Sequence, residues 1–183
     1  MMNTMLTRAD CLKLYGSDYL IGKRLQSKEL FLVEKGVYSY TQIVPEQAVI
    51  SFKYPFAIFT MLTAFYFYGL TDTAPEKYDL ATDRDAAKIN DPRVKQVFEH
   101  ANFLNAGVVE EKVSGYPIRI YNRERMLIEL LRKKSTISYD IYKEIIRNYR
   151  NIVDSLDMFK LEEYASLSPK SKKNTKALAE EVM

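Results

Sequence analysis

Residues 7–25 read TRADCLKLYGSDYLIGKRL and residues 30–40 read LFLVEKGVYSY, and these two stretches decide the fold of the N-terminal part. The first stretch has the signals of two short helices, and the second is typical of a β-hairpin that turns at Lys35 and Gly36. Two helices followed by a hairpin form the core of a winged helix. Such a unit can place a helix in a DNA major groove while the hairpin contacts the backbone nearby.

Local signals support both helices. Thr7 can accept a hydrogen bond from a free backbone N–H of the first turn, and Gly16 can end that helix with a positive φ. Ser17 or Asp18 can cap the second helix, which carries Ile21 on its inward face. These positions predict two helices that are separated by a tight turn.

The same pattern also fits an ordinary packing unit with a solvated basic face. Residues 1–44 carry six basic and four acidic side chains, which gives a net charge of +2. That charge is weak for a surface that neutralises phosphates. DNA binding and plain packing therefore both stay open on pattern and charge alone.

The whole chain has 183 residues, and the placement of its loop- and linker-type residues predicts two unequal domains, 1–44 and 45–183. With 47% hydrophobic residues and 28% charged residues, it has the composition of a globular protein. The single cysteine, Cys11, excludes an internal disulfide framework and a multi-cysteine zinc site. The N-terminal residues lack the apolar core of a signal peptide, and no apolar stretch reaches the roughly 20 residues of a membrane span. We therefore expect a cytoplasmic protein without a membrane partner.

The second domain mixes strand and helix signals. Residues 61–68 are apolar or aromatic nearly all round, which is typical of a buried helix, and no convergent polar group in the sequence marks a ligand pocket there. Strands are predicted at 78–82, 94–99, 108–113 and 116–121, and helices at 123–132, from Ser138 or Asp140, at 158–167 and after Ser168-Pro169. The fold class is therefore α+β: an N-terminal winged-helix-like domain, then a mixed domain with a small sheet and C-terminal helices.

Basic side chains gather between residues 119 and 150. This zone has nine basic and four acidic residues, a net charge of +5. Such a run is usually a solvated helix face, but its extent favours, as an alternative function, an interaction module that binds an acidic protein or an RNA. The nine residues are Arg119, Arg123, Arg125, Arg132, Lys133, Lys134, Lys143, Arg147 and Arg150.

Catalytic patterns are sparse. His100 is the only histidine, and a pair with Cys11 would join an inner helix position to a loop of the other domain. Asp79, Glu110 and Lys112 match the carboxylate, carboxylate and lysine set of metal-dependent nucleases, which leaves that activity as a remote alternative. On a hairpin the same residues more simply form cross-strand ion pairs. We expect no enzyme, no cofactor and no bound metal.

Three motifs, in their order and spacing, give the chain a family likeness over nearly its full length. They are EKGVY at 34–38, the segment from AIF at 57–59 to GLTD at 69–72 with Pro75, and IYNRER at 120–125. With these motifs the chain resembles the AbiEi family, the antitoxins of the AbiE abortive-infection toxin-antitoxin systems that defend bacteria against phage.

The resemblance implies a winged helix that represses its own operon at inverted repeats of operator DNA. It also implies a C-terminal domain that counters a nucleotidyltransferase-like toxin, with or without a stable complex. By matching motif, the groove-facing residues are Tyr19, Lys23, Arg24, Gln26 and Ser27, and the phosphate contacts are Arg8, Lys28, Lys35 and Tyr38.

The chain departs from the family at its start, because members often have a further helix before the segment at 5–8. Without that helix the winged helix has an apolar flank, which residues of the second domain or a second copy of the chain would cover. Both a monomer and a dimer on DNA are compatible with this pattern.

Overall fold

A computed structural model of the chain describes residues 5–169 and 176–180. The chain forms two compact units, one of Met1–Pro55 with Glu110–Ile118 and the other of Phe56–Val109 with Arg119–Met183. The bounds expected from the sequence were 1–44 and 45–183, so the first unit takes in a further helix and the tip of a hairpin. The physical reason is one apolar cluster in which Ala48, Val49 and Tyr116 pack with Met5 and Val37.

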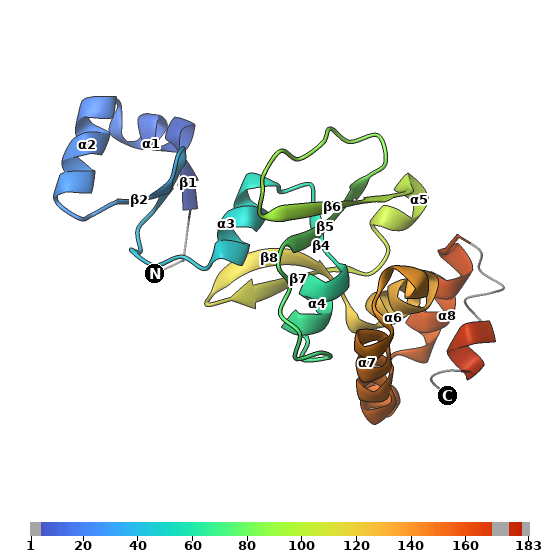
Figure 1. Cartoon of the computed structure of the whole chain (residues 1–183). Helices are drawn as coiled ribbons and strands as arrows, with labels where there is room; N and C mark the ends of the chain where they lie inside the picture. The colour runs from blue at the N-terminus through green and yellow to red at the C-terminus, as the bar shows by residue number, and fades with distance from the viewer. Residues whose placement is uncertain (1–4, 170–175, 181–183) are drawn as a thin grey trace. The chain divides into compact units, whose positions relative to one another are not determined.

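The first unit contains the predicted two helices and hairpin (Figure 1). Its sheet has the order β1-β3-β2, with both outer strands antiparallel to β3. The elements are β1 Met5–Thr7, α1 Arg8–Tyr15, α2 Asp18–Gln26, β2 Phe31–Glu34, β3 Val37–Ser39 and α3 Glu46–Lys53. Strand β1 was not predicted from the sequence. Its pairing turns the hairpin into a three-stranded sheet, which is more stable than two strands alone.

The predicted ends of α1 and the start of α2 are confirmed. Thr7 accepts a hydrogen bond from the Asp10 N–H, while the Asp10 carboxylate accepts one from the Thr7 N–H, which completes a capping box. Gly16 ends α1 with φ 84°. Of the two candidate caps for α2, Ser17 is the cap, and its Oγ accepts from the Leu20 N–H at 3.3 Å.

Cys11 lies inside the first unit, as expected. It is fully buried in an apolar cluster with Leu6, Ile21 and Leu30. Burial raises the pKa of the Cys11 thiol, so this side chain is a neutral core group at physiological pH.

A five-stranded mixed sheet has the order β6-β5-β4-β8-β7, and its residues belong to the second unit except for the tip of the β7–β8 hairpin, Glu110–Ile118. Helices α6, α7 and α8 also belong to the second unit (Figure 1). Strand β4 is antiparallel to β5 and parallel to β8, and β5 is parallel to β6. The strands are β4 Ile58–Phe59, β5 Tyr78–Asp83, β6 Val94–Glu99, β7 Val108–Val113 and β8 Tyr116–Tyr121. The helices are α4 Met61–Phe67, α5 Ala101–Leu104, α6 Arg123–Arg132, α7 Tyr139–Ile152 and α8 Met158–Leu167, with short 3-10 turns at Lys134–Thr136 and Val153–Ser155. The α+β class predicted from the sequence is confirmed.

The β7–β8 hairpin turns at Ser114 and Gly115, which both have positive φ, as a type I′ turn requires.

Within the described parts of the chain, no helix has the length and apolar character that a bilayer crossing demands. A short helical stretch at 176–180 belongs to the expected basic terminal helix, whereas Lys170, Lys172 and Lys173 lie outside the described residues.

Candidate functional site

One face of α2 carries the predicted groove-facing set. Tyr19, Lys23 and Gln26 are all exposed and follow each other at helical spacing, and Ser27 continues the face just beyond the helix. The Lys23 Nζ lies 4.8 Å from the centre of the Tyr19 ring, a cation–π distance. The structure therefore brings these four side chains together on one solvent-facing surface.

Two predicted DNA contacts take part in exposed ion pairs. The Arg8 guanidinium donates to both carboxylate oxygens of Asp18, at 3.1 and 2.6 Å, and Arg24 pairs with Glu29. Arg24 also lies over the Tyr15 ring, with its Cζ 4.9 Å from the ring centre. Exposed pairs of this kind contribute little to stability, so both cations can exchange a carboxylate for a phosphate.

The wing presents Lys35 in the exposed turn beside Gly36, which has φ 82°. Lys28 is exposed as well, in the turn after α2, with φ 58°. Tyr38, also predicted as a phosphate contact, is half-buried, and its ring packs against the apolar cluster around Leu6. Its inward-facing ring is thus a packing element of the wing.

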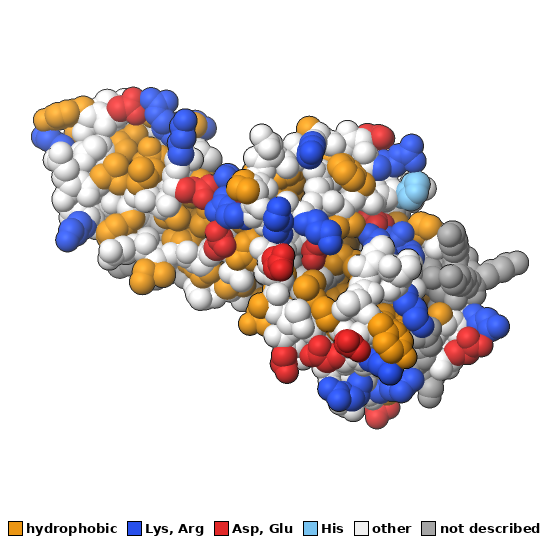
Figure 2. Space-filling view, in the orientation of Figure 1, with side chains coloured by type: hydrophobic (Ala, Val, Ile, Leu, Met, Phe, Trp, Pro, Cys, Tyr) orange, Lys and Arg blue, Asp and Glu red, His pale blue; other side chains and the backbone are white. Residues whose placement is uncertain are grey.

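An apolar flank accompanies these polar residues. Leu14 and Leu20 are 59% and 43% exposed, and they line a groove of about 700 Å³. Figure 2 shows orange hydrophobic and blue basic side chains next to each other on this unit. The other groove residues are Tyr15, Lys23, Arg24, Gln26, Ser27 and Glu29. The sequence analysis did not identify Leu14 and Leu20 as part of this surface. The signal that could have identified them is their position off the inward, core-facing side of their helices.

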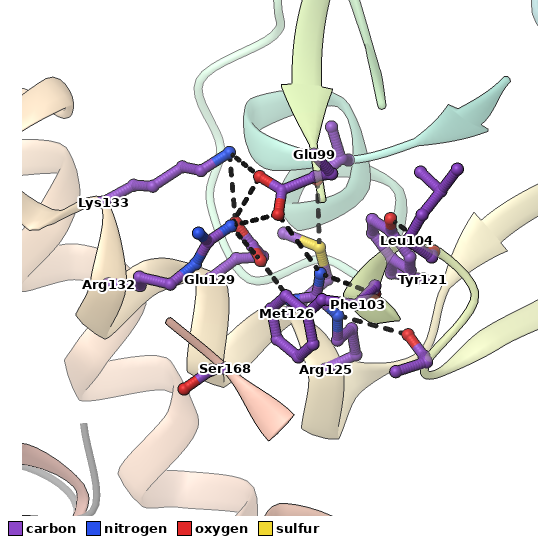
Figure 3. A network of polar contacts seen from close by, with 12 residues as sticks. Glu99, Phe103, Leu104, Tyr121, Arg125, Met126, Glu129, Arg132, Lys133 and Ser168 are labelled. Carbon is purple, nitrogen blue, oxygen red and sulfur yellow. Dashed lines mark hydrogen bonds and ion pairs between the residues drawn. The ribbon is translucent and has the colours of Figure 1, made fainter. Parts of the chain in front are cut away.

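Three residues of the predicted basic surface, Arg125, Arg132 and Lys133, are not available to a partner. The Arg125 side chain is fully buried, and those of Arg132 and Lys133 are 15% and 18% exposed. Figure 3 shows them converging on two buried carboxylates, Glu99 from the end of β6 and Glu129 from α6. The prediction of a surface role for these three residues was wrong, because counting charges along the chain does not reveal burial.

The Arg125 guanidinium is enclosed by aromatic rings and oxygen atoms. Its Cζ lies 3.3 Å from the Phe103 ring centre and 4.5 Å from that of Tyr121. The guanidinium pairs with Glu129 and donates to the backbone carbonyl oxygens of Ala106, at 3.2 Å, and Phe103, at 3.4 Å. These contacts fix α6 to the segment that follows β6.

The network keeps Glu129 ionised. Burial by itself raises the pKa of this carboxyl, but the charges of Arg125, Lys133 and Arg132 outweigh burial and hold the pKa below its ordinary value. Burial likewise lowers the pKa of Arg132, and Glu129 and Glu99 more than reverse that effect. With three cations around two anions, the network connects the end of β6 to α6 within the second unit.

The rest of the basic zone is a mixed surface. Lys143 lies 4.4 Å from the Tyr139 ring centre, and Arg123 lies 5.2 Å from that of Tyr68. Figure 2 shows red acidic side chains among the blue ones over α7. Among the predicted surface residues, Arg123, Lys134, Lys143, Arg147 and Arg150 are exposed and Arg119 is half-buried.

The predicted nuclease set is divided between the two units. Asp79 belongs to the second unit, whereas Glu110 and Lys112 belong to the hairpin tip of the first. Asp79 Oδ2 accepts a hydrogen bond from the Leu62 N–H at 3.0 Å, so this carboxylate caps α4, whereas the side chain of the N-cap residue, Thr60, makes no capping hydrogen bond. Among the residues that the structure describes, no three His, Cys, Asp or Glu side chains are grouped as a metal site requires.

Comparison with known proteins identifies a shared fold. The chain matches no family model, and no curated protein matches it in sequence. Its fold is similar to that of the RV2827C protein from Mycobacterium tuberculosis, with a TM-score of 0.65 and 12% identity over 96% of this chain and 71% of that one. At this identity the similarity concerns the fold alone.

Proposed function

We propose that this protein binds DNA through α2 and the wing of its first unit and acts as a repressor and antitoxin of the AbiE type. The observation that carries the DNA-binding part is the exposed face of Tyr19, Lys23 and Gln26, in a unit that also has a wing with an exposed Lys35 at its turn. In winged helices this pairing of elements reads the major groove and holds the adjacent backbone.

In this arrangement each side chain has a distinct task. Lys23 and Gln26 carry donors and acceptors that match base edges, and Lys28 and Lys35 supply charge to phosphates. Arg8 and Arg24 reach phosphates once they leave Asp18 and Glu29. The operator is the promoter of the protein's own operon, which places its action in the cytoplasm.

The antitoxin part rests on the resemblance to the AbiEi family. The motif residues of the second unit are mostly structural: Asn122 caps α6, Arg125 lies in the buried network, and Thr71 donates to Glu144 at 2.9 Å. They support a shared fold for this domain. The residues that counter a nucleotidyltransferase-like toxin would then lie on the exposed surface around them.

DNA binding is tested by fluorescence anisotropy with the DNA upstream of the coding sequence, over a series of salt concentrations. We expect Gln26→Ala to weaken binding to this DNA by about 1–3 kcal/mol and to leave binding to unrelated DNA unchanged. Lys35→Ala should weaken binding to both DNAs and reduce the salt slope by about one. Lys160→Ala, at an exposed position of α8 in the second unit, is the matched control.

Equal affinities for wild type, the Gln26 variant and the Lys35 variant would refute the assigned interface. Glu29→Gln adds a test of opposite sign, because it releases Arg24 from its carboxylate. We expect this variant to bind more tightly at low salt and similarly to wild type at high salt.

The antitoxin role is tested by co-expression with the product of the adjacent gene. If that product is a nucleotidyltransferase-like toxin, this protein should restore growth, and the exposed basic residues Lys143 and Arg147 can be substituted to find the responsible surface. An adjacent gene of another kind, together with no binding to the upstream DNA, would contradict the proposal. RNA or acidic-protein binding through that surface would then be the remaining function.

A further inference from the structure

The second unit contains a cavity of about 420 Å³ with a partly apolar lining and one buried carboxylate, Asp79. Its volume lies in the range of small-molecule sites, roughly 300–1,000 Å³. Asp79 and Lys95 stand in its wall as cross-strand neighbours on β5 and β6. The apolar walls are formed by Met61, Leu62, Phe65, Ile137, Ile141 and Ile145.

Asp79 has an oxygen atom without a hydrogen bond. Its side chain is 5% exposed, and while Oδ2 accepts from the Leu62 N–H, the buried Oδ1 has no hydrogen-bond partner among the described residues. The ammonium of Lys95 is 3.7 Å from Oδ1, beyond hydrogen-bond distance, and the Lys95 side chain is 70% exposed. A buried acceptor without a donor is destabilising, and more so when it is charged.

The electrostatics agree with an unsatisfied acceptor. Burial raises the pKa of Asp79, although Lys95 and the backbone N–H groups of Leu62 and Thr63 act to lower it. The charged residues that line the cavity, Glu76, Lys77, Asp79 and Lys95, sum to zero, so the cavity as a whole attracts neither sign. Any preference for charge therefore comes from the buried oxygen.

Backbone strain marks the same wall. Met61, at the first position of α4, has φ 44°, which is unusual for a side chain of this size. Strained residues that persist in a folded protein are often found at ligand sites. Here the conformation places Met61 and the capped N–H of Leu62 together at the cavity.

We propose that this cavity binds a small organic primary amine, whose N–H group donates to Asp79 Oδ1 while its apolar body packs between α4 and α7. An ammonium is favoured over a neutral donor because charge-assisted hydrogen bonds are about twice as strong as neutral ones. Lys95 has a flexible stem and little burial, so it can move into solvent and leave its place to the ligand.

The site is tested with benzylamine, and with benzyl alcohol and benzoate as neutral and anionic probes of similar shape. Binding to the full chain is followed by NMR through the Leu62 amide, which donates to the other oxygen of the same carboxylate. We expect benzylamine to shift this resonance saturably, benzyl alcohol to bind at least several-fold more weakly, and benzoate not to bind. Equal binding of the three probes, or no binding of benzylamine, would overturn the proposal.

Asp79→Asn separates the two oxygen atoms of this side chain. The amide oxygen can still accept from Leu62, while an NH₂ group takes the place of Oδ1, so benzylamine affinity should fall at least about tenfold. Lys95→Gln removes the competing cation and keeps the proposal testable if the first variant does not fold. This variant should bind benzylamine more tightly, Lys160→Gln should be unchanged, and weaker binding to the Lys95 variant would contradict the assigned role of Asp79.

Discussion

Replacing Glu129 by Gln tests whether the buried network holds the second unit together. In the wild-type protein, Glu129 contacts Arg125, Arg132, at 2.9 Å, and Lys133, at 3.3 Å. The substitution leaves three cations with one carboxylate, Glu99, which lies 3.9 Å from the buried Arg125. Removing one partner of a buried pair costs about 3–5 kcal/mol, and the hydrogen bond that the Gln oxygen still accepts from a neighbouring cation places this variant at about 3 kcal/mol.

Urea unfolding followed by circular dichroism measures the change. For a chain of this size, about 3 kcal/mol corresponds to a melting temperature lower by roughly 6–12 °C. Because the folded-state pKa of Glu129 is lowered, its contribution is fully present above the unfolded pKa, about 4.3, and is lost as the pH falls through the folded pKa. The difference between variant and wild type should therefore be constant near neutral pH and should shrink below about pH 4.

Asp18→Asn is the matched control for this experiment. It removes a carboxylate of an ion pair whose two side chains are 57% and 65% exposed, and we expect no measurable loss of stability. If Glu129→Gln lost as little stability as this control, or if its loss of stability did not shrink at acidic pH, the network would not hold the second unit together.

Two further predictions concern the backbone and a tyrosine. Gly107→Ala should lower the free energy of unfolding by more than about 1–2 kcal/mol in a denaturation assay, because Gly107 has φ 77° and an added Cβ would lie 2.4 Å from the Arg125 Cβ. Gly22→Ala, in open space within α2, should be neutral or stabilising. In an ultraviolet titration, Tyr15 should ionise near pH 12, since burial and then the hydrogen bond with Tyr40 raise its pKa to about 12. Tyr40→Phe should lower that value, and stability should fall above about pH 10, where the unfolded tyrosine ionises first.

Elements with strong local patterns were predictable from the sequence. Strand β6 at 94–99, the hairpin strands at 108–113 and 116–121, and α8 at 158–167 have the predicted bounds. Alternation, turn residues and caps specify such elements within a few neighbouring residues. Strand β1 has three residues and no such signal, and it is a strand because β3 pairs with it.

The sites were less predictable because their partners are distant in the chain. Asp79 caps α4 from a strand position 17 residues away from Leu62, while the side chain of the local N-cap residue, Thr60, makes no capping hydrogen bond. Arg125 meets Glu99 from β6, so a basic run that resembles a solvated face is partly internal. The dense aromatic helix suggested plain core for the same reason, since the polar group beside it comes from another element.

The positions of the cations decide how the two basic regions should be interpreted. Along the chain the zone at 119–150 has the larger net charge, but its buried members are paired with Glu99 and Glu129 and cannot be exchanged without loss of stability. The first unit has less charge, yet Lys23 and Lys35 are exposed and Arg8 and Arg24 are held by exposed carboxylates that solvent already screens. Phosphate contact depends on cations that can change partner at low cost, so the weaker basic region is the better candidate for DNA.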